Sequence, residues 1–234
     1  ACPDWPLCFG KFIPDYHPQV YFEFIHRALA GGMGIFALAI YSLIFTHKKI
    51  SKTLKLVGGF AFVIYGIQVT MGALTVLKLL QPGMVATHLV LGMTFMAVLQ
   101  WVYLSLPRSS QETSKTQCAP SWVTYSAIFV LFAIAAQIIL GGKVASNYAG
   151  LACSVDFPLC FGKIAPSFEG AIGLHVMHRL GAYVALISVV AFFVSLNLSR
   201  VRVTNPRLTK VSRVLITLVL IQIALGIANI KFFL

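Results

Sequence analysis

The chain has 234 residues, of which 59% are hydrophobic and only 10% are charged, and it carries a formal net charge of +12. Its mean hydropathy of +0.88 excludes an ordinary soluble domain, in which about a quarter of the residues are charged. The positive charge does not imply a nucleic-acid partner, because 11 of the 18 basic residues lie in three connections between apolar stretches, at 46–55, 107–120 and 199–213. Basic connections of this kind face the cytoplasm of a membrane protein.

Six apolar stretches follow one another along the chain. A helix that crosses a bilayer needs about 20 apolar residues, and the sequence predicts such helices at 20–45, 56–77, 84–106, 121–142, 171–198 and 212–230. A soluble protein can bury one or two helices that are apolar on all sides, but not six in succession. The predicted fold class is therefore all-α, a polytopic membrane helical bundle.

The segment before the first helix returns before the fifth. Segments 4–14 and 156–166 are identical at 8 of 11 positions, with a constant offset of 152 residues. Each copy has another cysteine just upstream, and each is followed, 18 residues after its later cysteine, by a His-Arg pair. Four predicted helices separate the two cysteine loops, so both loops face the same side. This pattern predicts two parallel repeats related by an axis along the membrane normal.

The repeat also predicts the organisation of the chain. We assign 1–106 to an N-terminal repeat, 107–120 to a cytoplasmic linker and 121–234 to a C-terminal repeat. At an offset of 152, the counterpart of helix 121–142 would precede residue 1, and the counterpart of helix 84–106 would follow residue 234. We therefore expect four helices in each repeat and eight in the complete protein. Six are visible here, because the first repeat lacks its first helix and the second lacks its last.

Four cysteines lie in the two repeated loops. The predicted topology places Cys2, Cys8, Cys153 and Cys160 on the extracytoplasmic face, where disulfides persist. Five residues separate the first two and six separate the second two, so that a disulfide can close within each loop. A zinc site is the alternative, although the spacing is wider than the two to four residues usual between paired ligands.

Histidines lie inside the predicted helices, where an ionisable side chain is costly and usually functional. His26 and His88 lie about 9 Å and 6 Å from the starts of two helices that both begin at the outer face. Two imidazoles at one depth on helices of a four-helix unit are what a bis-histidine haem requires. His178 holds the equivalent place in the second repeat. Hydrogen bonding between helices is the alternative role for each.

Charged residues beside these histidines distinguish the two repeats. Glu23 lies one turn before His26, whereas the second repeat has His175 at this place. The difference favours acid–base chemistry in the first repeat, and pairing of Glu23 with Arg27 is the alternative. Arg27 and Arg179 are candidates to bind haem propionates through charge-assisted hydrogen bonds, with anchoring at the membrane interface as the alternative.

Together these motifs resemble the haem A synthase family, membrane enzymes of cytochrome oxidase assembly. The resemblance rests on the loop Cys-Pro-Asp-Trp-Pro-Leu-Cys-Phe-Gly-Lys, on Glu23-x-x-His26-Arg27, on His88 and on the second cysteine pair followed by His178-Arg179. It covers essentially the whole chain. It implies oxidation of the C8 methyl of haem O to a formyl group by successive hydroxylations, which yields haem A.

The resemblance also implies roles for individual residues. His26 and His88 would flank the substrate haem O or its product haem A, with Glu23 as the catalytic carboxylate. His178 would be one axial ligand of a haem b that relays electrons, and the second ligand is absent from this sequence. Each cysteine pair would shape the loop over the haem of its own repeat.

The implied location is a prokaryotic plasma membrane with the cysteine loops outside. Partners implied beyond the bilayer and haem O could include haem O synthase, assembly factors of the oxidase and a second copy of the chain, whereas the electron donor is unknown. A thiol–quinone oxidoreductase and a non-catalytic membrane haem electron-transfer protein are the competing functions. The intramembrane histidines argue against the first, and Glu23, present in one repeat only, argues against the second.

Overall fold

The computed structural model describes residues 2–78, 80–106 and 119–232, and these form helices and loops without a strand. The long helices are α1 (Pro18–Thr46), α2 (Lys52–Leu77), α3 (Pro82–Ser105), α4 (Ser121–Ser146), α5 (Gly170–Leu198) and α7 (Pro206–Phe232). All six are long and apolar enough to cross a membrane. The predicted all-α membrane bundle is confirmed. The expected total of eight helices stays a prediction.

Several helices extend beyond their predicted bounds. Helix α7 begins at Pro206 instead of residue 212, and α4 continues to Ser146 instead of ending at 142. The sequence prediction stopped where charged residues begin, but arginine and lysine are good helix formers whose charged ends can reach the interface. Two short elements were not predicted, the 3₁₀ turn η2 (Ala149–Leu151) and the one-turn helix α6 (Val201–Thr204). Most of the predicted linker, 107–118, lies outside the described residues.

Local sequence explains where helices start. Pro18 and Pro82 lie in the first turns of α1 and α3, where proline has the required φ and the missing N–H costs no hydrogen bond. The side-chain oxygen of Ser51 accepts a hydrogen bond from the backbone N–H of Leu54, at 3.2 Å, and so caps α2.

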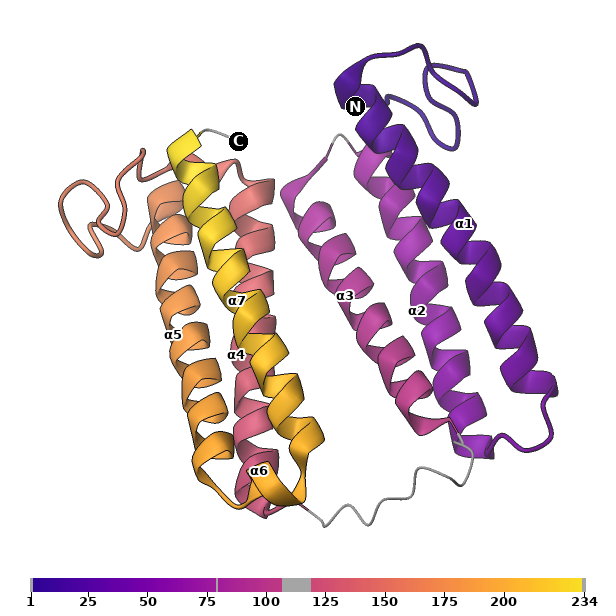
Figure 1. Cartoon of the computed structure of the whole chain (residues 1–234). Helices are drawn as coiled ribbons and strands as arrows, with labels where there is room; N and C mark the ends of the chain where they lie inside the picture. Colours follow the sequence, from indigo (N-terminus) through magenta and orange to yellow (C-terminus); the bar gives the residue numbers. More distant parts are fainter. Residues whose placement is uncertain (1, 79, 107–118, 233–234) are drawn as a thin grey trace. The chain divides into compact units, whose positions relative to one another are not determined.

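The chain divides into two compact units, Ala1–Ser109 and Ser110–Leu234, and each is described by itself. In the first unit α1, α2 and α3 run antiparallel in a row, and α2 packs most extensively against α3 (Figure 1). In the second unit α5 packs against both α4 and α7. The two repeats expected from the sequence, with their bounds at 1–106 and 121–234, stay a prediction.

In each unit a small cluster of buried apolar side chains packs the helices together at the end away from the cysteine loop. Ile44, Leu54 and Val102 form the cluster of the first unit, and Val123, Leu196 and Val201 that of the second. Large side chains elsewhere on the helices point outwards; Phe36 and Phe132, for example, are 73% and 71% exposed. Lipid must cover such surfaces, as expected of an integral membrane protein.

Candidate functional site

Both cysteine pairs are disulfides, Cys2–Cys8 and Cys153–Cys160, with Cα atoms 4.9 Å apart in each. The predicted disulfides within the loops are confirmed, and zinc ligation by these cysteines is excluded. All four cysteines are buried. In each unit the disulfide packs against the start of the following helix, through Val20 in α1 and Val176 in α5. The disulfide therefore fixes its loop over the helix that carries the His-Arg pair.

A tight turn inside each disulfide loop explains the repeated Phe-Gly dipeptide. The backbone N–H groups of Cys8 and Lys11 each donate to the other residue's carbonyl, at 3.0 and 3.1 Å. Between them Phe9 and Gly10 have φ angles of 52° and 71°. Positive φ at both central residues is the signature of a type I′ turn, in which glycine is favoured. The second loop repeats these bonds and angles at 160–163.

Asp4 stabilises the turn of the first loop. Its carboxylate accepts hydrogen bonds from the backbone N–H groups of Phe9, at 2.7 Å, and Gly10, at 2.9 Å. These bonds, that from Gly10 above all, lower the pKa of Asp4 below its ordinary value. In the described part of the second loop the carboxylate of Asp156 has no matching pair of hydrogen bonds. Since the folded loop prefers the ionised form, Asp4 stabilises it above the unfolded pKa of about 3.9, and this contribution is lost as the pH falls through the lower folded pKa.

We expect acid to loosen the first loop more than the second. As the pH falls below about 4, Cys2–Cys8 should become easier to reduce relative to Cys153–Cys160, because protonated Asp4 accepts the turn N–H groups only weakly. The measurement is mass spectrometry of alkylated peptides after brief phosphine reduction at a series of pH values. In the Asp4→Asn variant the ratio of the two reduction rates should no longer change over this range. A ratio with the same pH profile in both proteins would contradict the role of Asp4.

The two arginines at equivalent positions of the repeat hold the loops to the helices. Nη1 of Arg27 donates to the carbonyl oxygens of Asp4 and Leu7, both at 2.8 Å. Arg179 makes the equivalent bonds to the carbonyls of Asp156, at 2.8 Å, and Leu159, at 2.7 Å. The sequence analysis did not foresee this anchoring of loop carbonyls. It uses the Nη groups of both arginines, so their predicted contacts with haem propionates stay a prediction.

The structure places Glu23 beside Arg27, the alternative considered from the sequence. Oε1 of Glu23 pairs with Nη2 of Arg27 at 2.5 Å, and Oε2 accepts a hydrogen bond from the backbone N–H of Cys2 at 2.7 Å. At the equivalent position of the second unit, the ring nitrogen Nδ1 of buried His175 lies 2.9 Å from the carbonyl of Ala149. Both residues therefore anchor an adjoining loop. The catalytic role of Glu23 stays a prediction.

The three candidate haem ligands lie on long helices near the ends that carry the cysteine loops. In the first unit His26 is exposed on α1 and His88 is half-buried on α3. In the second unit His178 is half-buried on α5, one residue before the arginine that holds the loop. Their roles as ligands stay predictions.

Sequence analysis missed two glutamines that contact these histidines. Nε2 of Gln68, on α2, lies 3.5 Å from Nε2 of His88. Nε2 of Gln137, on α4, lies 3.0 Å from Nδ1 of His178. A signal was present, because each glutamine starts the same five-residue pattern, Gln-x-x-x-Gly.

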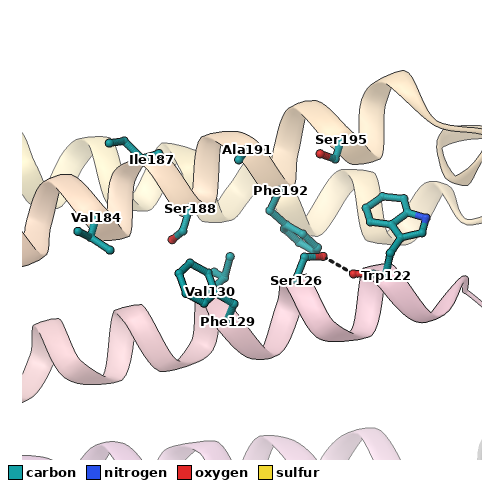
Figure 2. A pocket seen from close by; sticks show the side chains of 10 residues that line it. All are labelled: Trp122, Ser126, Phe129, Val130, Val184, Ile187, Ser188, Ala191, Phe192 and Ser195. Carbon is teal, nitrogen blue, oxygen red and sulfur yellow. Dashed lines mark hydrogen bonds between the residues drawn. The ribbon is translucent and has the colours of Figure 1, made fainter.

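Figure 2 shows a groove between α4 and α5, and no histidine lines it. Its lining is apolar except for serines, and the hydroxyls of Ser126 and Ser188 donate to carbonyls of their own helices, those of Trp122 and Ala185. Ser188 lies ten residues beyond His178, about 15 Å along the helix. The groove holds no titratable side chain and is not part of the candidate site.

Comparisons with known proteins agree with the motifs. The family model COX15-CtaA, described as cytochrome oxidase assembly protein, matches residues 13–234. A "Heme A synthase" of Shewanella oneidensis is 31% identical, with 98% of this chain and 78% of that protein covered. Proteins of the same name from Sinorhizobium medicae and Shouchella clausii are each 30% identical, over 94% and 81% of this chain. The chain spans 63% and 64% of the lengths of those two proteins.

Proposed function

Because this chain belongs to the COX15-CtaA family of cytochrome oxidase assembly proteins, we propose that it works as a haem A synthase, an oxidoreductase that converts haem O to haem A. The observation that carries the proposal is the duplicated arrangement of a disulfide loop, an arginine that holds it and a histidine next to that arginine on a membrane helix. The chemistry is oxidation of the C8 methyl of haem O to a formyl group by successive hydroxylations.

The first unit is the proposed substrate site. His26 and His88 bind and orient haem O from α1 and α3, and Nδ1 of His88 is a buried nitrogen without a hydrogen-bond partner among the described residues. A buried unpaired nitrogen is costly unless a ligand satisfies it. Glu23 is the catalytic carboxylate, and it is the one acidic residue within the six long helices. Arg27 and the N–H of Cys2 orient this carboxylate, which can hold or move a proton beside the substrate.

The second unit is the proposed haem b site. When bound, haem b supplies one-electron transfer to the reaction. His178 fits as an axial ligand, because only Nδ1 of its ring meets the glutamine amide and Nε2 makes no hydrogen bond among the described residues. Arg179 is 92% buried, and its Nε lacks a partner there, so this group can donate to a propionate. His175, in the place of Glu23, bonds to a backbone carbonyl and supplies no carboxylate.

The proposal includes the sidedness and the complete helix count. The basic connections at 46–55 and 199–213 support a cytoplasmic position for their ends of the helices, and the disulfide loops at the opposite ends would then be extracytoplasmic. Eight helices in two four-helix repeats would enclose each haem on all sides.

The test is pigment extraction from cells that express the full-length protein together with a source of haem O. We expect haem A and hydroxylated intermediates in the extract, and a Soret band in the gently purified protein. Recovery of haem O alone would contradict catalysis and favour a haem electron-transfer protein. A purified protein without a Soret band would favour a thiol–quinone oxidoreductase that uses the disulfide pairs.

A further inference from the structure

A reciprocal contact between two helices surrounds His88. Gln68 and Gly72 lie one turn apart on α2, and His88 and Gly92 lie one turn apart on α3. A β-carbon added to Gly72 would lie 3.0 Å from Cε1 of His88, and one added to Gly92 would lie 2.9 Å from Nε2 of Gln68. Each polar side chain therefore lies against a glycine of the facing helix, where an added methyl group would make it shift.

The second unit contains the same arrangement on different helices. Gln137 and Gly141 lie one turn apart on α4, and His178 and Gly181 lie on α5. A β-carbon at Gly141 would lie 3.0 Å from Cε1 of His178, and one at Gly181 would meet Oε1 of Gln137. The α4–α5 and α2–α3 pairs are not equivalent in the repeat, since α5 corresponds to α1. A glutamine amide therefore meets a candidate ligand in both units, at Nε2 of His88 in the first and at Nδ1 of His178 in the second.

Unpaired atoms show that these contacts are incomplete as they stand. Among the described residues, Oε1 of Gln68 and Oε1 of Gln137 are both buried without a hydrogen-bond partner. In each contact one ring nitrogen of the histidine lies at the glutamine amide, and the other has no hydrogen bond there. A buried amide oxygen without a donor costs about 1–3 kcal/mol.

Binding of haem iron by His88 and His178 would give the unpaired glutamine oxygens a hydrogen-bond donor. When one imidazole nitrogen binds a metal, the other carries a proton and needs an acceptor, which fixes the ring orientation and strengthens the ligand. A half-turn of the glutamine amide exchanges its oxygen and nitrogen, and these are alike in size. The exchanged amide presents its oxygen to the ring N–H of the ligand. In the second unit this exchange gives up the hydrogen bond that Nε2 of Gln137 donates to the backbone carbonyl of His178, at 3.0 Å. The unpaired oxygen and the proton that metal binding leaves on the ring then satisfy each other.

We propose that Gln68 and Gln137 are positioning residues that accept a hydrogen bond from the iron-bound His88 and His178, in contacts that Gly72 and Gly141 make possible. This inference rests on the proposed function, because it needs haem at both histidines. It adds Gln68 and Gln137 as residues that affect the haem through a hydrogen bond to its histidine ligand. The inference predicts changes in the affinity, the reduction potential and the spectrum of the haem, in addition to any change in activity.

The experiment compares three variants of the full-length protein, two at Gln137 and one at Gln100. Gln137→Met keeps the length of the side chain and removes the acceptor, whereas Gln137→Glu keeps an acceptor oxygen. Gln100→Met is the matched control, since Gln100 is exposed on α3. We expect Gln137→Met to bind haem about 10-fold or more weakly and to shift its reduction potential to more positive values, because the ligand becomes a poorer electron donor. Gln137→Glu should keep the wild-type potential or lower it.

Glycine variants test whether Gly72 and Gly141 make the glutamine–histidine contacts possible. Gly141→Ala and Gly72→Ala should broaden or shift the low-spin signal of the haem in electron paramagnetic resonance, because the added methyl displaces the imidazole. Gly66→Ala is the control, since a β-carbon there meets nothing within 4 Å. Equal potentials, haem affinities and spectra in wild type, Gln137→Met and Gly141→Ala would overturn the inference. Wild-type protein without haem would instead refute the proposed function.

Discussion

Replacement of Glu23 by glutamine should slow the conversion of haem O to haem A by about 100-fold or more, the usual cost of losing a general acid or base. The haem should remain bound, because Glu23 contacts the Cys2 backbone and Arg27 and is not a proposed ligand. Glutamine keeps an oxygen that can accept the Cys2 N–H, so the loop should keep its place. The measurement is the ratio of haem A to haem O in extracted pigments, with total haem per protein taken from the absorption spectrum.

Two further variants separate catalysis from structure in this experiment. His26→Ala should lower both haem content and conversion, because it removes a proposed ligand of the substrate. Mass spectrometry of the Glu23→Gln protein should still find Cys2 and Cys8 as a disulfide. Wild-type conversion in Glu23→Gln would show that Glu23 only anchors the loop, as its hydrogen bonds already indicate it does in part.

Replacement of His178 by alanine should remove the haem of the second unit. We expect the haem content of the full-length protein to fall from about two per chain to about one, since loss of an axial nitrogen removes the main bond between iron and protein. Conversion of haem O should fall as well, because the second unit supplies electrons in the proposed function. Quantitative haem extraction with identification of each haem type checks both expectations.

The control is His47→Ala. His47 ends α1 in the connection to α2, and Nδ1 of its ring lies 3.3 Å from the backbone N–H of Lys49. Its removal should leave haem content and haem type unchanged. Retention of two haems by His178→Ala would show that His178 is a hydrogen-bonding residue of the helix interface, the alternative weighed from the sequence.

The repeat was the strongest guide that the sequence offered. The offset of 152 residues predicted two loops of the same local structure, and both have the same disulfide, the same turn and the same contact from an arginine. Such features could be predicted because they are local: a disulfide across six or seven positions and a turn of four residues depend on the adjacent sequence. The six helices could be predicted for a similar reason, since length and hydropathy are properties of one segment.

The contacts between helices could not be predicted in this way. The shared Gln-x-x-x-Gly pattern marks Gln68 and Gln137, but it does not indicate that Gln137 faces His178, 41 residues later, or that Gln68 faces His88. The sequence did not indicate that the arginines bind loop carbonyls, because the carbonyl groups that they hold lie 20 and 23 residues earlier in the chain. In a membrane, helices apolar on all sides carry no stripe that marks the packed face, so the packing follows from small residues and polar contacts instead.

The sequence by itself determined the membrane-spanning helices, the duplicated loops, the disulfides and the set of histidines from which ligands can come. Only the tertiary structure decided which atoms are already engaged: the Nη groups of Arg27 and Arg179 on loop carbonyls, Glu23 on the loop backbone, and the glutamine amides beside His88 and His178. The physical reason is that hydropathy and local turn geometry add up residue by residue along the chain. Hydrogen bonds between distant residues, in contrast, depend on how closely two helices approach, and here glycines set that distance.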